Sequence, residues 1–206
     1  MVTIHYFYDP MCGWCYGATP LIEAIVRNHQ FKLMLHPGGM LPAKAIEASF
    51  RQHIISSDQR ISDITGAQFG QDYIERVRSH EALVLDSYLP TRAVLTGESL
   101  GLPPFVMLKA IQQAHYMEGR RVNELETLEA LAVQLKLDPT LWRQKMQAME
   151  GAEIVAIEQS QQRMNQLNIQ GYPTLILEQN GQLMRLPHTE FYGRLEQWET
   201  WLAGLI

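Results

Sequence analysis

The chain has 206 residues, of which 46% are hydrophobic, so it can bury a full core without a framework of disulfides. Its formal net charge is -5, from 22 acidic and 17 basic residues, and no basic block interleaved with aromatic residues is present. This composition argues against a nucleic-acid partner, and no apolar run approaches the length that a bilayer span requires.

The first forty residues predict a strand, a helix and a second strand. Residues 3–8 are β-branched and aromatic, and residues 14–28 place apolar side chains on one helical face. Residues 31–36 alternate Phe and Leu side chains with Lys32, Met34 and His36. Pro20 lies inside the helix and should bend it, because proline removes one backbone hydrogen bond. Such a unit is expected to be right-handed, with parallel strands.

From residue 42 to about residue 151 the hydrophobic period becomes helical. Pro90, Gly101 and the Pro103-Pro104 pair divide this block. We expect helices over 43–55, 68–78 and 105–117, a helix capped by Asn123 and Glu126, and another that begins at Asp138-Pro139.

The remaining residues predict a helix, a hairpin and a last helix. The first helix ends near Leu167, and Asn180-Gly181 between the apolar runs 174–177 and 182–186 is a strong hairpin signal. Residues 190–205 are amphipathic and predict the terminal helix.

Both cysteines of the chain, Cys12 and Cys15, lie at the predicted start of the first helix. Thiols at this spacing are close enough to form and open a disulfide without refolding. The unsatisfied N–H groups and the dipole of a helix start favour a thiolate, so we expect Cys12 to be the nucleophile. Cys15, one turn deeper, is the expected resolving thiol.

Two other uses of this cysteine pair have to be weighed. A tetrahedral zinc site needs two further ligands, and the sequence contains no second cysteine pair and no His-x3-5-His motif. A static disulfide over so short a loop would stabilise the chain little and would be opened in a reducing cytosol. Reversible thiol-disulfide exchange is therefore the preferred interpretation.

Three motifs give the sequence a resemblance to a known family. Cys12-Gly13-Trp14-Cys15, Pro20 and Tyr172-Pro173-Thr174, in this order of elements, resemble a thioredoxin fold with the helical insertion of the DsbA family. The resemblance covers nearly the whole chain and is nearest to the cytosolic DsbA-like branch. It implies an α/β thioredoxin-like domain formed by 1–40 and 151–206, with 41–150 as an inserted helical domain.

The resemblance also implies the roles of several residues. Pro173 corresponds to the cis-proline that faces the active site, and the backbone of Gly171 and Tyr172 would pair with an extended substrate segment. Gly13 and Trp14, between the cysteines, are further substrate-binding candidates, although Trp14 has an equally good interpretation as a ring that packs over the helix start.

The sequence departs from the family pattern at two places. Tyr6 stands where thioredoxins and periplasmic DsbA proteins carry a buried carboxylate, and the neighbouring His5 should point to the opposite face of its strand, so the proton acceptor for Cys15 is unassigned. The dipeptide Gly13-Trp14 is neither Gly-Pro nor Pro-His, so the motif does not indicate the direction of electron flow.

These observations predict a thiol-disulfide oxidoreductase of the reductase or isomerase type. It would act on protein or small-molecule disulfides, with glutathione as a co-substrate and without a bound cofactor, metal, nucleic acid or membrane. The start of the sequence shows no signal peptide, so the expected location is the cytoplasm.

Two rival functions remain open from sequence alone. The first is a glutathione-dependent isomerase or kappa-class-like glutathione transferase, in which a single serine or cysteine activates glutathione; the retention of both cysteines argues against it. The second is a chaperone-like binding protein that uses the helical insertion as its contact surface and carries a non-catalytic dithiol.

Overall fold

The computed structural model describes residues 2–205 and is built on a four-stranded mixed sheet. The strands stand in the order β2-β1-β5-β6, and β1 pairs in parallel with β2 and antiparallel with β5. The strand bounds are β1 Val2–Tyr8, β2 Phe31–Pro37, β5 Thr174–Gln179 and β6 Gln182–Arg185. The predicted strands, their parallel start and the Asn180-Gly181 hairpin are thereby confirmed, as is the thioredoxin fold with a helical insertion.

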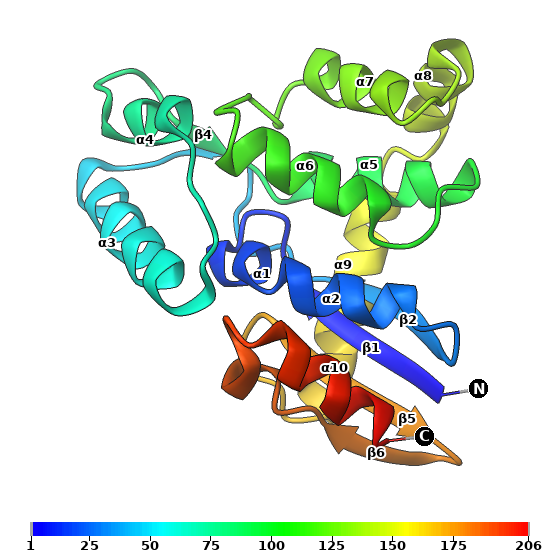
Figure 1. Ribbon diagram of the computed structural model, residues 1–206. Coiled ribbons are helices and arrows are strands. Elements are labelled where there is room, and N and C mark those ends of the chain that lie inside the picture. Colours follow the sequence, from blue (N-terminus) through cyan, green and yellow to red (C-terminus); the bar gives the residue numbers. More distant parts are fainter. Residues whose placement is uncertain (1, 206) are drawn as a thin grey trace.

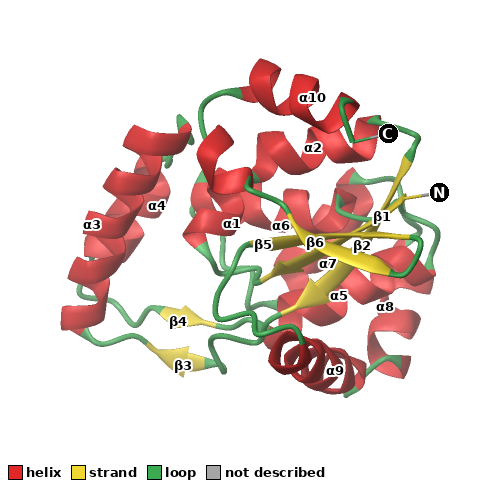
Figure 2. Cartoon of the chain, turned by 90° about the horizontal axis from the view of Figure 1, so that it is seen from below, coloured by secondary structure: helices red, strands yellow, loops and turns green. Residues whose placement is uncertain are grey.

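Helices cover both faces of this sheet (Figure 2). Helices α1, α2 and α10 lie on one face, and α9 lies on the other. Their bounds are α1 Gly13–Gly17, α2 Thr19–Arg27, α9 Ala152–Gln166 and α10 Leu195–Ala203. Strand β1 alternates accordingly, because Ile4 and Tyr6 pack in the larger core while Phe7 packs with Met164 and Ile176 on the side of α9.

The insertion between β2 and α9 is almost wholly helical and arches over the end of the sheet that carries α1 (Figure 1). A two-residue β3–β4 bridge, Lys44–Ala45 with Val84–Leu85, is its only strand pairing among the described residues. Its helices are α3 Ala48–Thr65, α4 Gln71–Arg78, α5 Tyr88–Ser99, α6 Val106–Tyr116, α7 Leu125–Gln134 and α8 Pro139–Ala148.

Several predicted element boundaries are wrong. The single helix expected over 14–28 is two helices that meet at Ala18, and Pro20 stands in the first turn of the second, where its missing N–H costs nothing. The last helix is also divided, into a 3-10 turn at His188–Phe191 and α10, with Gly193 at φ +70 between them.

Three predictions within the insertion also need correction. The helix expected over 43–55 is α3, which begins five residues later and continues to the left-handed Gly66. Helix α5 was not expected because Pro90 reads as a breaker, but Pro90 occupies its first turn. Asn123 does not cap α7, which begins one residue later with Glu124 at the cap position and without a side-chain cap.

Asp138 caps α8 as predicted, accepting hydrogen bonds from the backbone N–H groups of Thr140 and Leu141. No helix in residues 2–205 has both the length and the apolar character that crossing a membrane requires.

Candidate active site

Cys12 and Cys15 lie in contact at the start of α1. Cys12 is the N-cap residue, and its Sγ accepts a hydrogen bond from the backbone N–H of Cys15 at 3.3 Å. Both residues are free thiols, and Cys12 keeps 6% of its surface exposed while Cys15 keeps none. A sulfur in this position receives an N–H group that a helix start leaves unpaired.

The environment of Cys15 is quite different. Burial raises the pKa of its thiol well above the ordinary value, and a hydrogen bond with Cys12 and the charge of that residue raise it further. The backbone of Asp9 partly opposes this effect. Cys15 therefore holds its proton more firmly than a free cysteine.

The loop before β5 faces Cys12. The Tyr172-Pro173 peptide bond is cis, as the resemblance implied, and the carbonyl oxygen of Tyr172 lies 3.7 Å from the Sγ of Cys12. The Tyr172 hydroxyl donates to the carbonyl of Gly38 at 3.4 Å, which ties this loop to the end of β2. Gly171 is exposed and Pro173 is buried, so backbone next to the thiol is open to an extended segment.

A cavity of about 390 Å³ opens beside the dithiol. Its lining is apolar and aromatic and comes from four parts of the chain: Trp14, Ile64, Tyr172, Pro173, Thr189 and Tyr192. The Trp14 ring stacks on Tyr192 with 5.8 Å between centroids. Ile64, Thr189 and Tyr192 were not predicted, because they belong to the insertion and to the segment before α10 and carry no local motif.

Gly13 does not line this cavity. A Cβ on Gly13 would lie 2.8 Å from Cδ1 of Ile61 and 3.1 Å from Oδ1 of Asp58, both on α3. The structure therefore places Gly13 in the packing of α1 against the insertion. Its substrate-binding role stays a prediction, as do those of Trp14 and Gly171.

Asp9 holds three segments together behind the dithiol. Its side chain is fully buried and accepts hydrogen bonds from the backbone N–H of Met11 at 2.8 Å, that of Met40 at 2.7 Å, and the Ser87 hydroxyl at 2.8 Å. Burial raises the pKa of this carboxyl, and these hydrogen bonds counteract part of the effect. Nothing in the pattern of the sequence predicts that Asp9 is buried.

His5 lies on the opposite face of β1, as expected. Its ring nitrogens lie 2.9 Å from Nε2 of His36 and 2.7 Å from Oε2 of Glu178. Both histidines thus have polar partners away from the thiols, and burial lowers the pKa of His36 to about 4. Within residues 2–205 no group of three or more histidine, cysteine or acidic side chains is arranged to hold a metal ion.

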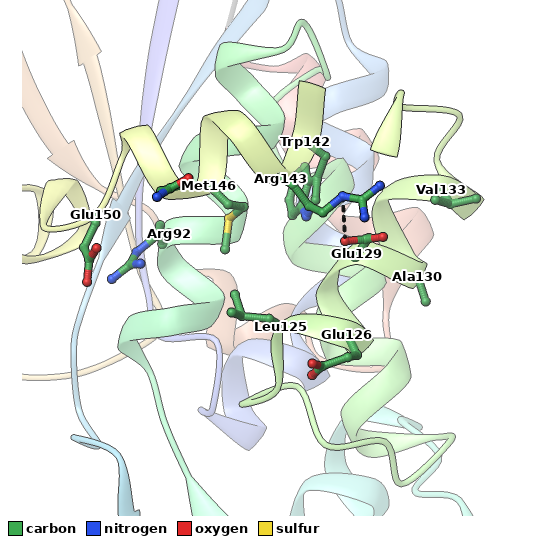
Figure 3. Close-up of a pocket in the computed structure, with 11 residues that line it drawn as sticks. Arg92, Leu125, Glu126, Glu129, Ala130, Val133, Trp142, Arg143, Met146 and Glu150 are labelled. Atoms are coloured by element: carbon green, nitrogen blue, oxygen red, sulfur yellow. Dashed lines mark ion pairs between the residues drawn. The ribbon is translucent and has the colours of Figure 1, made fainter. Parts of the chain in front are cut away.

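A larger cavity, of about 880 Å³, lies in the insertion, away from the dithiol (Figure 3). Trp142, Met146 and Leu125 form part of its wall, and Arg143 pairs with Glu129 at 3.5 Å across it. Neither cavity is lined by a cysteine, but the smaller one includes Trp14, which lies between the two thiols, and the Tyr172-Pro173 loop that faces Cys12.

One protein family matches this chain over most of its length. The model of the DSBA-like thioredoxin domain matches residues 3–192, which include both cysteines and the cis-proline loop. The chain belongs to the DsbA-like thioredoxin family. No curated protein sequence matches this DsbA-like chain.

Solved structures agree with this DsbA-like assignment. The chain is similar to the cytosolic disulfide reductase DsbM from Pseudomonas aeruginosa, with 36% identity, a TM-score of 0.89 and coverage of 98% of each chain. The structure of that protein with GSH gives 35% identity, the same TM-score and the same coverage. A structure from Nitrosomonas europaea, at 24% identity, a TM-score of 0.77 and 98% coverage of each chain, shares the fold.

Proposed function

We propose that this DsbA-like protein is a thiol-disulfide oxidoreductase of the reductase or isomerase type, in which Cys12 attacks the substrate and Cys15 resolves the product. The contact between the two free thiols carries this proposal. Cys12 holds the helix-start position, keeps 6% of its surface exposed and receives the N–H of Cys15, whereas Cys15 has no exposed surface. The asymmetry assigns the roles, because only Cys12 can meet an external disulfide.

The reaction proceeds through two exchanges. The Cys12 thiolate attacks one sulfur of the substrate disulfide, forms a mixed disulfide and releases the first substrate thiolate. Cys15 then loses its proton and attacks Sγ of Cys12, so that the second substrate thiolate leaves and the Cys12–Cys15 disulfide forms. Two external thiols return the pair to the dithiol: the first attacks Sγ of Cys12 and releases Cys15, and the second releases Cys12 and leaves joined to the first as a disulfide.

Protein and small-molecule disulfides are the proposed substrates, and glutathione is the proposed thiol that recycles the pair. The exposed backbone of Gly171, next to the Tyr172 carbonyl that contacts Cys12, supports binding of an extended peptide, and the structure of DsbM with GSH supports glutathione. The similarity to a reductase described as cytosolic supports a cytoplasmic location. No cofactor is required for thiol-disulfide exchange itself.

The two rival functions make different demands on the thiols. A glutathione-dependent isomerase or kappa-class-like transferase needs only one sulfur, and it would retain its activity after Cys15→Ser. A chaperone-like protein would use the insertion, whose large cavity has the half-exposed Leu125 and Val133 in its wall, and would need neither thiol. The contact between Cys12 and Cys15 favours the redox function over both rivals.

A disulfide-reduction assay on two single variants tests the assignment. Cys12→Ser should abolish reduction of a peptide disulfide in the presence of glutathione, because the nucleophile is lost. Cys15→Ser should still form a mixed disulfide but should release product much more slowly. Full activity of Cys12→Ser would show that the nucleophile is wrongly assigned, and unchanged turnover by Cys15→Ser would favour the single-thiol mechanism.

A further inference from the structure

Two buried tyrosine hydroxyls lie beside the dithiol turn, one next to Cys15 and one next to Trp14. Tyr6 is fully buried in the middle of β1, and its hydroxyl donates to the carbonyl oxygen of Cys15 at 3.4 Å. Burial raises the pKa of Tyr6 well above the ordinary value, and the charges of Cys15 and Cys12 and a hydrogen bond with the Cys15 side chain add to this. The hydroxyl of Tyr6 therefore lies against residue 15, with the carbonyl oxygen as its hydrogen-bond acceptor in this structure.

The second hydroxyl belongs to Tyr192, whose ring stacks on Trp14. Its oxygen is buried and has no hydrogen-bond partner among residues 2–205. Burial raises the pKa of Tyr192, and because Trp14 lies between the two cysteines, this unpaired donor stands beside the dithiol turn. A buried hydroxyl without a partner costs free energy, which indicates that another state of the site uses its proton.

The Cys15 sulfur needs such donors during exchange. When an external thiolate attacks Sγ of Cys12, a new S–S bond forms, the Cys12–Cys15 bond breaks, and the electron pair leaves on Cys15 before a proton from solvent restores the thiol. A negative sulfur in an apolar core is strongly disfavoured unless hydrogen bonds stabilise it. The Asp9 side chain is already engaged as the acceptor of hydrogen bonds from Met11, Met40 and Ser87.

We propose that the hydroxyls of Tyr6 and Tyr192 donate hydrogen bonds to the Cys15 sulfur while it carries negative charge, both as the leaving group and as the resolving nucleophile. Tyr6 donates from the side of the core, and Tyr192 donates from the side of the cavity. This inference rests on the proposed function, and it assigns a role to the tyrosine that occupies the centre of β1. Neither phenol acts as the base, because a tyrosine with a raised pKa keeps its proton at neutral pH.

Tyr6→Phe and Tyr192→Phe test the proposal in two reactions. In the first, the oxidised protein is reduced by dithiothreitol, and the appearance of free thiols is followed by quenching, alkylation and mass spectrometry. Tyr6→Phe should slow this step about tenfold, since a hydrogen bond to a charged group is lost and 1.4 kcal/mol corresponds to a factor of ten. Tyr192→Phe should also slow it, and the double variant should be slower than either single variant.

The second reaction isolates Cys12. In a Cys15→Ala background, attack by Cys12 on 5,5′-dithiobis(2-nitrobenzoate) releases a coloured thiolate without any charge on residue 15. Tyr6→Phe should leave this rate unchanged, and Tyr192→Phe, whose ring also lines the cavity, should slow this reaction less than it slows the reduction by dithiothreitol. Tyr8→Phe is the matched control, because Tyr8 is buried on the same face of β1 and stacks on Tyr6, with 5.5 Å between ring centroids. It should leave both reactions unchanged.

Two results would overturn the inference. Reduction of both phenylalanine variants at the wild-type rate would show that the hydroxyls are not used, and equal slowing in both reactions would show that they only maintain the geometry of the site. Tyr192→Phe decides the question if Tyr6→Phe does not fold. Failure of the proposed function itself would look different, because the Cys15→Ala protein would then not react through Cys12 at all.

Discussion

At the scale of single residues, the site depends on the hydrogen bonds of one buried polar side chain, Asp9. Asp9 connects the dithiol loop, the loop after β2 and the start of α5 through Met11, Met40 and Ser87. An ionised group in such a position is tolerated only where hydrogen bonds replace water. The position of the dithiol loop therefore depends on residues that lie 31 and 78 positions from Asp9 along the chain.

Ser87→Ala tests this dependence. The change removes the hydroxyl that donates to Asp9 and also accepts from the backbone N–H of Leu41 at 3.1 Å. The backbone N–H of Leu41 loses its partner and Asp9 loses one of its donors, so we expect a loss of about 1–3 kcal/mol in the free energy of unfolding, measured by urea denaturation. Ser56→Ala removes an exposed hydroxyl from α3 and should have almost no effect. Equal effects from the two variants would contradict the role given to Asp9.

Asp58 gives the protein a pH dependence of its own. It is buried on α3, accepts a hydrogen bond from the Tyr73 hydroxyl at 2.8 Å, and has its pKa raised by burial from 3.8 to about 6. The folded state therefore binds a proton at a higher pH than the unfolded state does. Its contribution to stability is fully present below about pH 4 and is lost as the pH rises through about 6.

Asp58→Asn should remove this component. Compared with wild type, the variant should lose less stability between pH 4 and pH 7, by an amount on the order of 1–3 kcal/mol, in urea titrations at both pH values. Asp63→Asn, an exposed change on the same helix, is the control and should leave the wild-type profile in place. If the Asp58 variant and wild type show parallel profiles, Asp58 does not titrate as described.

At the scale of elements, the decisive contact is that between α1 and α3. Gly13 and Gly17 both face α3, which brings the backbone of the dithiol helix against Ile61 and Thr65. The short α1 is separated from α2 at Ala18, so its position is set by the insertion as well as by the sheet. The insertion thus takes part in placing the two cysteines.

Gly17→Ala tests the tightness of this contact. The added Cβ would lie 2.9 Å from Cγ2 of Thr65 and 3.0 Å from Cγ2 of Ile61, and these short β-branched side chains have little room to move. We expect a destabilisation of about 1–3 kcal/mol in thermal or urea unfolding. Gly204→Ala is the control, because its nearest contact is an ordinary 3.4 Å and its backbone is helical. A Gly17 variant as stable as the Gly204 variant would show that the contact is loose.

At the scale of the whole molecule, the sequence predicts the fold where local signals are strong. Hydrophobic period and turn chemistry predict the β1-α-β2 unit, the Asn180-Gly181 hairpin and the Asp138 cap. The spacing of the two cysteines predicts the dithiol. The rest depends on contacts between distant segments. Pro90 reads as a break in isolation but starts α5, and the cavity beside Cys12 takes Ile64 and Tyr192 from segments without any motif.

The proposed function depends on reversible exchange between the two thiols, and an equilibrium redox titration tests this exchange most directly. The protein would be equilibrated in graded glutathione buffers, and its state followed by tryptophan fluorescence, since Trp14 lies between the cysteines. We predict a single reversible two-electron transition that disappears in Cys12→Ser and in Cys15→Ser. A protein that shows no such transition, or one that persists in either variant, would contradict the proposed function.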